Sequence, residues 1–372
     1  MSDWFGKEVF KLGFGLMRLP KLEDGKTIDV EQTAKMVDLF LDAGGTYFDT
    51  AYVYDNGESE AAIRKALVER HPRESYTLCT KLNAWLGEPD EAEAKRQLEI
   101  SLERTGAGYF DYYLLHALQR NNYKKYDEYR LWDFVKEAKE KGSIKYWGFS
   151  FHGDPALLEE LLTAHPDVDF IQLHINYADW ENPDVAAREC WEIARKPGKS
   201  VTIMEPVKGG ALADPIPQVQ EIFKKAAPEL SCASWAIRYA ASLEGIITVL
   251  SGMSNIAQME DNLSYMKDFK PLTEAEQQVI ADAKAAMDAV DTIKCTACHY
   301  CTENCPMQIP IPEIFSVRNQ QMIFNQGAGR YAHVTKEKGK ASDCIQCGQC
   351  EGACPQHLPI ISYLQDCAVN LE

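Results

Sequence analysis

The stretch GGTYFDTAYVY, residues 44–54, decides the fold of this chain. It predicts a short buried strand that ends at Asp49, followed by a loop that carries Tyr54. In a parallel α/β barrel, catalytic groups gather at the carboxyl ends of the strands. An acid at a strand end and a phenol on the next loop are therefore well placed for proton chemistry.

Strand and helix patterns alternate along the chain around this stretch. Besides residues 44–49, strand-like segments cover 13–19, 75–81, 109–115, 144–149, 170–173, 201–204 and 245–250. Helical patterns follow at 30–41, 58–70, 91–102, 129–141, 155–164, 183–194, 231–242 and 273–290. Eight strands that alternate with helices over about 250 residues predict a closed (β/α)₈ TIM barrel. A Gly-x-Gly-x-x-Gly run follows none of these strands, so the usual signal of an open dinucleotide-binding sheet is absent from the sequence.

Composition and charge narrow the class of protein. The chain has 372 residues and a formal net charge of −17, which argues against binding to a nucleic-acid backbone. The sequence has neither an apolar run as long as a membrane span nor a signal-peptide core at its start. We therefore expect a cytoplasmic protein that binds neither nucleic acid nor membrane.

The cysteines mark a second domain. Nine of the twelve lie between Cys295 and Cys367, and eight of these form two runs of the pattern C-x₂-C-x₂-C-x₃-C-P. This pattern is typical of two [4Fe–4S] clusters in which the fourth cysteine of each run binds the other cluster. One cluster would use Cys295, Cys298, Cys301 and Cys354, and the other Cys344, Cys347, Cys350 and Cys305. Zinc is the alternative that soft thiolates leave open.

The domain limits follow from this contrast in cysteine content. Residues 1–290 are predicted to form the barrel, and residues 291–372 a small, mostly α-helical ferredoxin-like domain. The helix-prone segments 312–326 and 329–338 between the two runs resemble those of α-helical dicluster ferredoxins. Cys79, Cys190 and Cys232 are expected to be buried thiols, and Cys367 has no predicted ligand role.

Four polar side chains at predicted strand ends form the candidate catalytic group: Asp49, Tyr54, Lys81 and His116. Taken singly, each has an ordinary explanation as a loop cap, a solvated charge or a buried histidine. Together they suit protonation of a carbonyl oxygen, because a lysine beside a tyrosine favours the phenolate and lowers its pKa. An aspartate would hold the lysine charged, and a histidine would orient the carbonyl.

In these residues the chain resembles the aldo-keto reductase family. The resemblance covers about residues 5–290 and includes Asp49-Thr50-Ala51, Thr80-Lys81, Leu114-Leu115-His116, Gly148-Phe149-Ser150 and Glu205-Pro206. It implies nicotinamide-dependent reduction of a carbonyl, with Tyr54 as general acid, Lys81 and Asp49 as its tuning pair, and His116 as the residue that orients substrate. It also implies a branch of the family that carries a C-terminal dicluster domain.

The resemblance also implies a cofactor site on the loops after the later strands. Its predicted members are Ser150, Gln172, Met204, Glu205, Pro206, Val207, Lys208, Gly209, Gly210, Ser251, Gly252, Met253, Ser254, Gln258, Asp261 and Asn262. NADPH-specific relatives carry cations around the 2′-phosphate where this chain has Gly252 and Gln258. We therefore expect a weak NADPH preference and use of NADH.

The combination of modules leaves two functional hypotheses. The leading one is an oxidoreductase that transfers hydride between NAD(P)H and a carbonyl or alcohol substrate, while two clusters relay electrons to a partner protein. The alternative is a reductase-like nucleotide-binding redox sensor or scaffold, in which the clusters are structural or dock a partner. The aromatic residues Trp85, Tyr123, Tyr177 and Trp180 fit either the mouth of a substrate pocket or ordinary packing.

Overall fold

A closed barrel of eight parallel strands forms the larger part of the protein. The computed structural model describes residues 9–372 apart from 86, 88, 89 and 304. The strands pair in chain order, and β1 also pairs with β8 through Phe14 and Ser251, which closes the barrel. They are β1 (Leu12–Gly15), β2 (Tyr47–Asp49), β3 (Thr77–Leu82), β4 (Phe110–Leu118), β5 (Ile144–Phe151), β6 (Phe170–His174), β7 (Ser200–Met204) and β8 (Ile246–Ser251).

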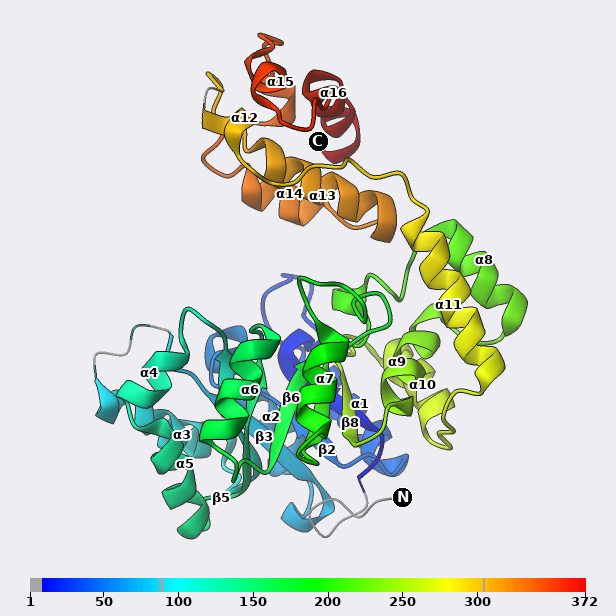
Figure 1. Cartoon of the computed structure of the whole chain (residues 1–372). Coiled ribbons are helices and arrows are strands. Elements are labelled where there is room, and N and C mark those ends of the chain that lie inside the picture. The colour runs from blue at the N-terminus through cyan, green and yellow to red at the C-terminus, as the bar shows by residue number, and fades with distance from the viewer. Residues whose placement is uncertain (1–8, 86, 88–89, 304) are drawn as a thin grey trace. The chain divides into compact units, whose positions relative to one another are not determined.

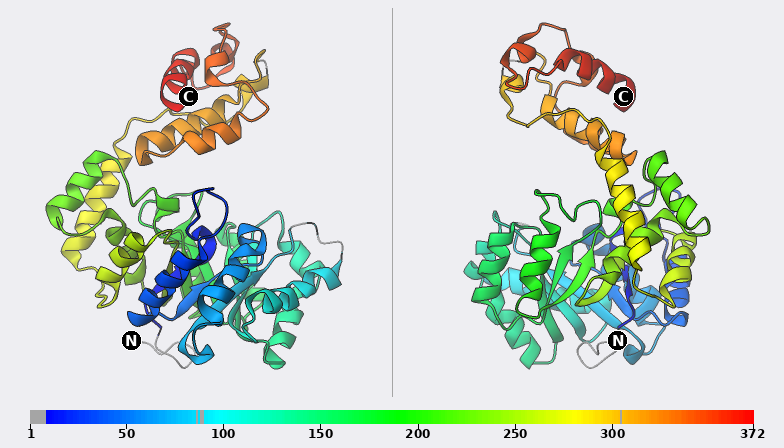
Figure 2. Two further views of the ribbon diagram at one scale, coloured as in Figure 1. Left: turned by 180° about the vertical axis from the view of Figure 1, so that it is seen from behind. Right: turned by 45° about the vertical axis from the view of Figure 1, so that its right-hand side comes forward.

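Helices surround the barrel on its outer side (Figures 1 and 2). They are α1 (Val30–Asp42), α2 (Glu58–Ile63), α3 (Glu91–Thr105), α4 (Tyr123–Glu128), α5 (Leu131–Glu140), α6 (Pro155–Ala164), α7 (Ala187–Arg195), α9 (Cys232–Ser242) and α10 (Ile256–Met266). Side-chain caps fix several starts: the carboxylates of Asp29, Asp90 and Asp154 accept backbone N–H groups at the first turns of α1, α3 and α6. The predicted (β/α)₈ fold is confirmed.

The structure differs from the predicted elements in a few places. It adds α4, α8 (Pro217–Ala226) and α10, each of which lies in a segment that the sequence pattern left unassigned. The predicted helix 58–70 narrows to α2 and continues as a turn of π-helix over Arg64–Val68. Strand β4 runs past its predicted end to Leu118, with a shift of register between Leu115 and Leu118. The functional loops after the strands are thus partly helical.

Alternation along each strand separates two apolar layers. Inside the barrel lie Tyr47, Cys79, Tyr112, Phe170 and Ile247, which pack together. Their chain neighbours, such as Phe48, Leu78 and Tyr113, belong to the core between the strands and the surrounding helices. Because side chains alternate across a strand with a period of two, every second residue of a strand faces the barrel interior. This alternation decides which polar side chains enter the barrel.

Backbone contacts divide the chain into two compact units. The first runs to Gly209 and resumes over Ala233–Gln277, and the second comprises Gly210–Cys232 and Gln278–Glu372. Helix α11 (Glu274–Asp288) begins with the predicted capping box, in which Thr273 and Glu276 bond reciprocally. The predicted barrel domain, residues 1–290, stays a prediction. Residues 1–8 of that range lie outside the described residues.

The cysteine-rich part of the second unit is helical. It contains α12 (Tyr300–Glu303), α13 (Ile311–Phe324), α14 (Ala328–Val334), α15 (Gln349–Ala353) and α16 (Ile360–Leu371). Its own core includes Ile314, Phe315 and Leu364, and the thiol of Cys367 is fully buried there. Among the described residues, no helix is long and apolar enough to cross a membrane.

Gly148 offers a test of the barrel packing. A Cβ on this residue would lie 2.2 Å from the carbonyl oxygen of Phe170 on the neighbouring strand. Gly148→Ala is therefore expected to cost about 1–3 kcal/mol of barrel stability, because the backbone of β6 must move. The measurement is the urea midpoint followed by circular dichroism. Gly15→Ala is the matched control, since its nearest atom lies at an ordinary 3.4 Å; equal midpoints for the two variants would contradict the prediction.

Candidate active site and cluster sites

The side chains of Asp49, Lys81 and His116 meet inside the barrel because of strand alternation. Asp49 is two residues beyond inward-facing Tyr47, and Lys81 is two residues beyond inward-facing Cys79. Strand β2 pairs with β3 through Asp49 and Cys79, which brings the two polar residues to the same end of the barrel. The apolar layer beneath them fills the barrel interior, so these polar side chains are shielded from water on that side.

Lys81 and Asp49 form a buried ion pair. The Nζ atom of Lys81 donates to Oδ1 of Asp49 at 2.5 Å and to the carbonyl oxygen of Thr50 at 2.6 Å. The side chain of Lys81 is fully buried. Burial alone would lower the pKa of Lys81, but the carboxylate of Asp49 outweighs it and the pKa lies above its usual value. Lys81 is therefore charged at any physiological pH.

The pKa of Tyr54 is raised, contrary to the expectation from sequence. Nζ of Lys81 lies 4.7 Å from the centre of the Tyr54 ring and favours the phenolate. Burial of the phenol is the larger effect, and the pKa of Tyr54 lies above its ordinary value near 10. Tyr54 therefore keeps its proton at neutral pH, which is the form that a general acid requires.

His116 lies next to Tyr54 and is neutral. The two rings have centroids 5.8 Å apart. Burial, followed by the charge of Lys81, holds the pKa of His116 well below its usual value. Its Nδ1 atom is buried and has no hydrogen-bond partner within the described part of the chain. The indole of Trp85 donates to the backbone oxygen of His116 at 3.3 Å, so an aromatic side chain stands beside the pair.

A set of buried contacts that the sequence did not reveal positions the loop of Tyr54. The hydroxyl groups of Thr50 and Ser59 lie 2.8 Å apart, and Ser59 also donates to the backbone oxygen of Leu16. Arg104 of α3 donates to the backbone oxygen of Tyr52 at 3.0 Å and pairs with the fully buried Glu60 at 3.2 Å. These contacts join the loop to α3 and to the 3₁₀ turn Leu16–Arg18 that follows β1. The only sequence signal was an acid within an otherwise apolar helical face.

Gln172 and Ser150, which were predicted to contact the cofactor, are already engaged. Gln172 reaches the ion pair from β6, where its Nε2 donates to Oδ2 of Asp49 at 3.3 Å. The hydroxyl of Ser150 accepts from the backbone N–H of Ala117 at 2.7 Å. The two residues are paired directly across β5 and β6. Gln172 thus supports the second oxygen of Asp49, a role that the sequence did not indicate.

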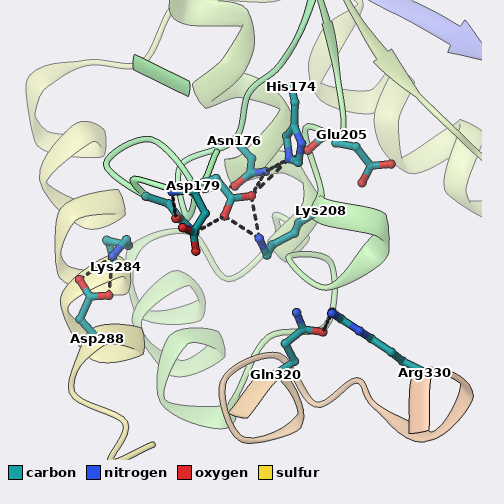
Figure 3. A network of polar contacts seen from close by, with 11 residues as sticks. His174, Asn176, Asp179, Glu205, Lys208, Lys284, Asp288, Gln320 and Arg330 are labelled. Carbon is teal, nitrogen blue, oxygen red and sulfur yellow. Dashed lines mark hydrogen bonds and ion pairs between the residues drawn. The ribbon is translucent and has the colours of Figure 1, made fainter. Parts of the chain in front are cut away.

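The loop after β7 is held by a buried carboxylate, Asp179 (Figure 3). Lys208 donates to both oxygens of Asp179, at 2.6 and 2.7 Å, and the Nδ2 atom of Asn176 donates to Oδ2 at 2.9 Å. Burial opposes ionisation of Asp179, but His174, Lys208 and Asn176 hold its pKa well below the usual range. Asn176 also donates to the backbone oxygen of Glu205. The charge of Lys208 is therefore matched by a buried anion.

The predicted residues between Met204 and Gly210 follow one another around this loop. Met204 ends β7 opposite His174 of β6. Glu205, Lys208, Gly209 and Gly210 all have positive φ angles, of 57°, 50°, 65° and 99°. Such angles are costly for residues other than glycine, so the loop conformation is imposed by its surroundings. Pro206 is buried, and Val207 packs against the outer core of the barrel.

The remaining predicted cofactor residues lie at the end of β8 and on α10. Asn262 donates to the hydroxyl of Ser251 at 2.8 Å and accepts from the phenol of Tyr265 at 2.5 Å. Gln258 accepts from the backbone N–H of Ser254 at 2.7 Å. Met253 is buried, Gly252 is exposed, and Asp261 is half-buried on α10. The structure thus places this group on one strand-to-helix connection.

The eight run cysteines fall into two sets of four, each around one small cavity. Cys295, Cys298, Cys301 and Cys354 line the first, together with Ile311 and Phe315. Cys305, Cys344, Cys347 and Cys350 line the second, with Ile309 and Leu364. Each set takes three thiols from one run and the fourth from the other. All eight thiols are free, and four soft donors around a small apolar cavity fit an iron–sulfur cluster.

The two runs share left-handed backbone angles at equivalent described positions. Positive φ angles occur at Ala297 (51°), His299 (64°) and Gln308 (51°), and at the equivalent residues Gln346 (57°), Gly348 (75°) and His357 (52°). In both runs the second cysteine is exposed and the third is buried. Loops that alternate between the right- and left-handed regions turn their N–H groups to one side, as at many Fe–S sites. The sequence repeat is therefore also a structural repeat.

Comparison with known proteins agrees with the fold. Residues 11–285 match the model of the aldo/keto reductase family, and residues 294–358 match a 4Fe–4S dicluster domain. Since the first match covers most of the chain, the protein belongs to the aldo/keto reductase family. The predicted enzyme class, an NAD(P)H-dependent oxidoreductase of this family with an iron–sulfur domain, is confirmed.

Individual relatives resemble the barrel part of the chain. An uncharacterized oxidoreductase of Bacillus subtilis, YqkF, is 25% identical over 300 residues, which cover 72% of this chain and 90% of that protein. A 9,11-endoperoxide prostaglandin H2 reductase of Trypanosoma cruzi is 27% identical over 274 residues, 71% of this chain and 87% of that protein. The solved holo form of an aldo-keto reductase from Bacillus halodurans has a TM-score of 0.58 at 26% identity, covering 73% of this chain and 91% of that one.

The pKa directions predict the pH profile of carbonyl reduction. Because the pKa of Tyr54 is raised and that of His116 is lowered, neither group changes charge between about pH 6.5 and 9. We expect kcat/KM on an aldehyde panel to be flat across this range and to fall above about pH 10, where the acid form is lost. Tyr54→Phe should lower kcat by about 10²–10⁴-fold.

Tyr52→Phe is the matched control, since Tyr52 is a neighbouring half-buried tyrosine outside the ion pair. It should keep the activity of the unmodified protein. An inflection near pH 6.5, or equal rates for Tyr54→Phe and the unmodified protein, would contradict the assignment of the acid.

The cavity linings predict which cysteines act together. Cys295→Ser and Cys354→Ser should each remove the same cluster, although the two residues belong to different runs. Cys305→Ser and Cys344→Ser should remove the other. Each variant should retain about half the iron, and the electron paramagnetic resonance spectrum of the reduced protein should be the same within each pair.

Cys232→Ser, outside both cavities, is the control and should retain all the iron. If Cys354→Ser instead left the same spectrum as Cys344→Ser, each run would hold its own cluster and the crossed arrangement would be wrong.

Proposed function

We propose that the barrel catalyses reversible reduction of an aldehyde or ketone to an alcohol with a nicotinamide dinucleotide. The observation that carries this proposal is the protonated Tyr54 beside the buried Lys81–Asp49 pair, with neutral His116 next to it. This group can give a proton to a carbonyl oxygen and leave the resulting phenolate stabilised by an adjacent cation.

The residues of the site divide the work among themselves. Tyr54 donates its proton to the carbonyl oxygen, and the ammonium of Lys81 compensates the negative charge that remains on the phenol. Asp49 keeps Lys81 charged and fixed, and Gln172 holds the other oxygen of Asp49. Neutral His116 hydrogen-bonds the same carbonyl oxygen and so fixes its direction. A bound reduced nicotinamide supplies the hydride to the carbonyl carbon.

The cofactor is proposed to lie on the loops after β5 to β8. Ser150, Gln172 and Met204 would surround the nicotinamide, the loop from Glu205 to Gly210 would contact the pyrophosphate, and α10 would face the adenine. The residues present fit such a ligand, because the ends of β6 and β7 are adjacent and glycines stand at 209 and 252. No lysine or arginine lies between Ser251 and Gln258 to hold a 2′-phosphate, so we propose that NADH is used and that any NADPH preference is weak.

The two cysteine sets are proposed to hold two [4Fe–4S] clusters that exchange electrons with a partner protein. When bound, such clusters exchange single electrons. The chain keeps them in a separate helical core that contributes its own apolar lining. Twelve free thiols suit a reducing compartment, and we propose the cytoplasm as the location. The alternative is a sensor or scaffold with structural clusters, which the complete barrel site disfavours.

An anaerobic titration separates these roles. Stopped-flow spectra of the holoprotein mixed with NADH, and separately with NADPH, should show bleaching of cluster absorbance if electrons pass from the barrel to the clusters. Oxidation of one NADH or NADPH releases two electrons and one proton, so we expect each nucleotide to bleach two clusters by one electron each, with the proton released to solvent. We expect the carbonyl turnover rates with the two nucleotides to lie within about tenfold of each other. Tyr54→Phe should bleach like the unmodified protein, because it lacks only the acid.

Each outcome has a distinct meaning. Turnover without bleaching would exclude the electron relay and favour structural clusters. A preference for NADPH of a hundredfold or more would overturn the cofactor proposal. Absence of turnover across a broad panel of aldehydes and ketones, with nucleotide still bound, would favour the sensor.

A further inference from the structure

Arg18 lies across the predicted cofactor loops, although it comes from the opposite end of the barrel sequence. It ends the short 3₁₀ turn Leu16–Arg18 that follows β1. Its Cβ, Cγ and Cδ atoms lie 3.6–3.7 Å from where a Cβ on Gly252 would stand, and its Nη2 atom lies 3.5 Å from the equivalent point on Gly209. The side chain therefore crosses the loop after β8 and ends at the loop after β7.

Arg18 supplies a positive charge that no direct ion pair engages at this place. It forms no hydrogen bond or ion pair with any part of the chain that the structure describes, and its side chain is exposed. The other cation of the β7 loop, Lys208, is held at 2.6 and 2.7 Å by both oxygens of Asp179. The carboxylate of Glu205 also faces Gly209, with Oε2 at 3.7 Å from the Cβ point. Without Arg18 this loop would present no spare positive charge to an anion.

We propose that the guanidinium of Arg18 binds the pyrophosphate of the dinucleotide, an inference that rests on the proposed function. An arginine presents paired N–H donors that match phosphate oxygens, and its charge also offsets that of Glu205. The position of Nη2 selects the pyrophosphate over the adenosine 2′-phosphate. Nη2 lies at Gly209, whereas only the apolar stem of Arg18 covers Gly252, where the 2′-phosphate is expected.

Two glycines, Gly209 and Gly252, lie against Arg18 in this arrangement. Gly209 has φ of 65°, in the left-handed region, and the side chain of any other residue there would point at Arg18 and Glu205. A Cβ on Gly252 would lie at ordinary contact distance, 3.6–3.7 Å, from the stem of Arg18. The cation that the chain lacks on the β8 loop is thus replaced in space by one from β1. Because both NADH and NADPH contain the pyrophosphate, Arg18 would strengthen both equally.

Binding experiments on the holoprotein test this inference independently of turnover. Isothermal titration under anaerobic conditions would compare Arg18→Ala, Arg18→Lys and the unmodified protein with four probes: NADH, NADPH, ADP and adenosine 2′-monophosphate. We expect Arg18→Ala to weaken NADH, NADPH and ADP by about ten- to a hundredfold, and to leave adenosine 2′-monophosphate unchanged. Arg18→Lys should restore part of the loss. Arg96→Ala, which removes an exposed arginine of α3, is the matched control and should bind like the unmodified protein.

The outcomes separate this inference from the proposal beneath it. If Arg18→Ala binds all four probes like the unmodified protein, or loses affinity only for NADPH and adenosine 2′-monophosphate, the pyrophosphate role is wrong. If the unmodified protein binds neither NADH nor NADPH, the proposed function itself fails. Loss of NADH, NADPH and ADP binding together, with the 2′-monophosphate unaffected, supports the inference.

Discussion

The buried ion pair between Lys81 and Asp49 is the interaction on which the rest of the candidate active site depends. Removing either partner from such a pair leaves an unpaired buried charge, which typically costs about 3–5 kcal/mol. The barrel can hold the pair because the adjacent strands β2 and β3 present Asp49 and Lys81 inward at the same end of the barrel, each two residues beyond an inward-facing residue, Tyr47 and Cys79. Gln172 then uses the second oxygen of Asp49, and Tyr54 uses the charge of Lys81. The pairing register of β2 and β3 therefore decides whether the two charged groups can meet.

The candidate catalytic group could be located from the sequence because its members follow strand periodicity. Asp49, Lys81 and His116 each stand near the end of an apolar strand segment, and parallel strands bring such ends together. The direction of the pKa of Tyr54 could not be predicted, because it depends on how completely the loop covers the phenol. Glu60 and Arg104 hold that loop from α2 and α3, through a contact of residues 44 positions apart that no local pattern reveals.

The contacts around the candidate cofactor loops could not be predicted from the sequence either, because they also join residues that lie far apart along the chain. Asp179 neutralises Lys208, so this lysine of the β7 loop is engaged by a carboxylate and is not free for a phosphate. Arg18 belongs to the first strand-to-helix connection, and only closure of the barrel between β1 and β8 brings it to Gly252. The sequence of the β7 and β8 loops therefore contains one cation, Lys208, which is already paired with Asp179. It does not contain Arg18, which has no hydrogen-bond or ion-pair partner in the described structure. The charges that face a ligand at the end of a barrel can come from any of the eight strand-to-helix loops, because the first and last strands are neighbours.

In the cysteine-rich part, by contrast, the arrangement of the thiols follows the short-range spacing of the sequence. Equivalent residues of the two runs share the sign of φ, and the exchange of the fourth cysteine follows from the repeat itself. Cys301, Cys350 and Cys354 are core residues in this small helical unit, beside Ile309 and Phe315. A ligand held by these thiols would therefore fill the core as well as carry electrons, and folding and loading of this unit would be coupled. The barrel, by contrast, assembles its candidate site from side chains alone.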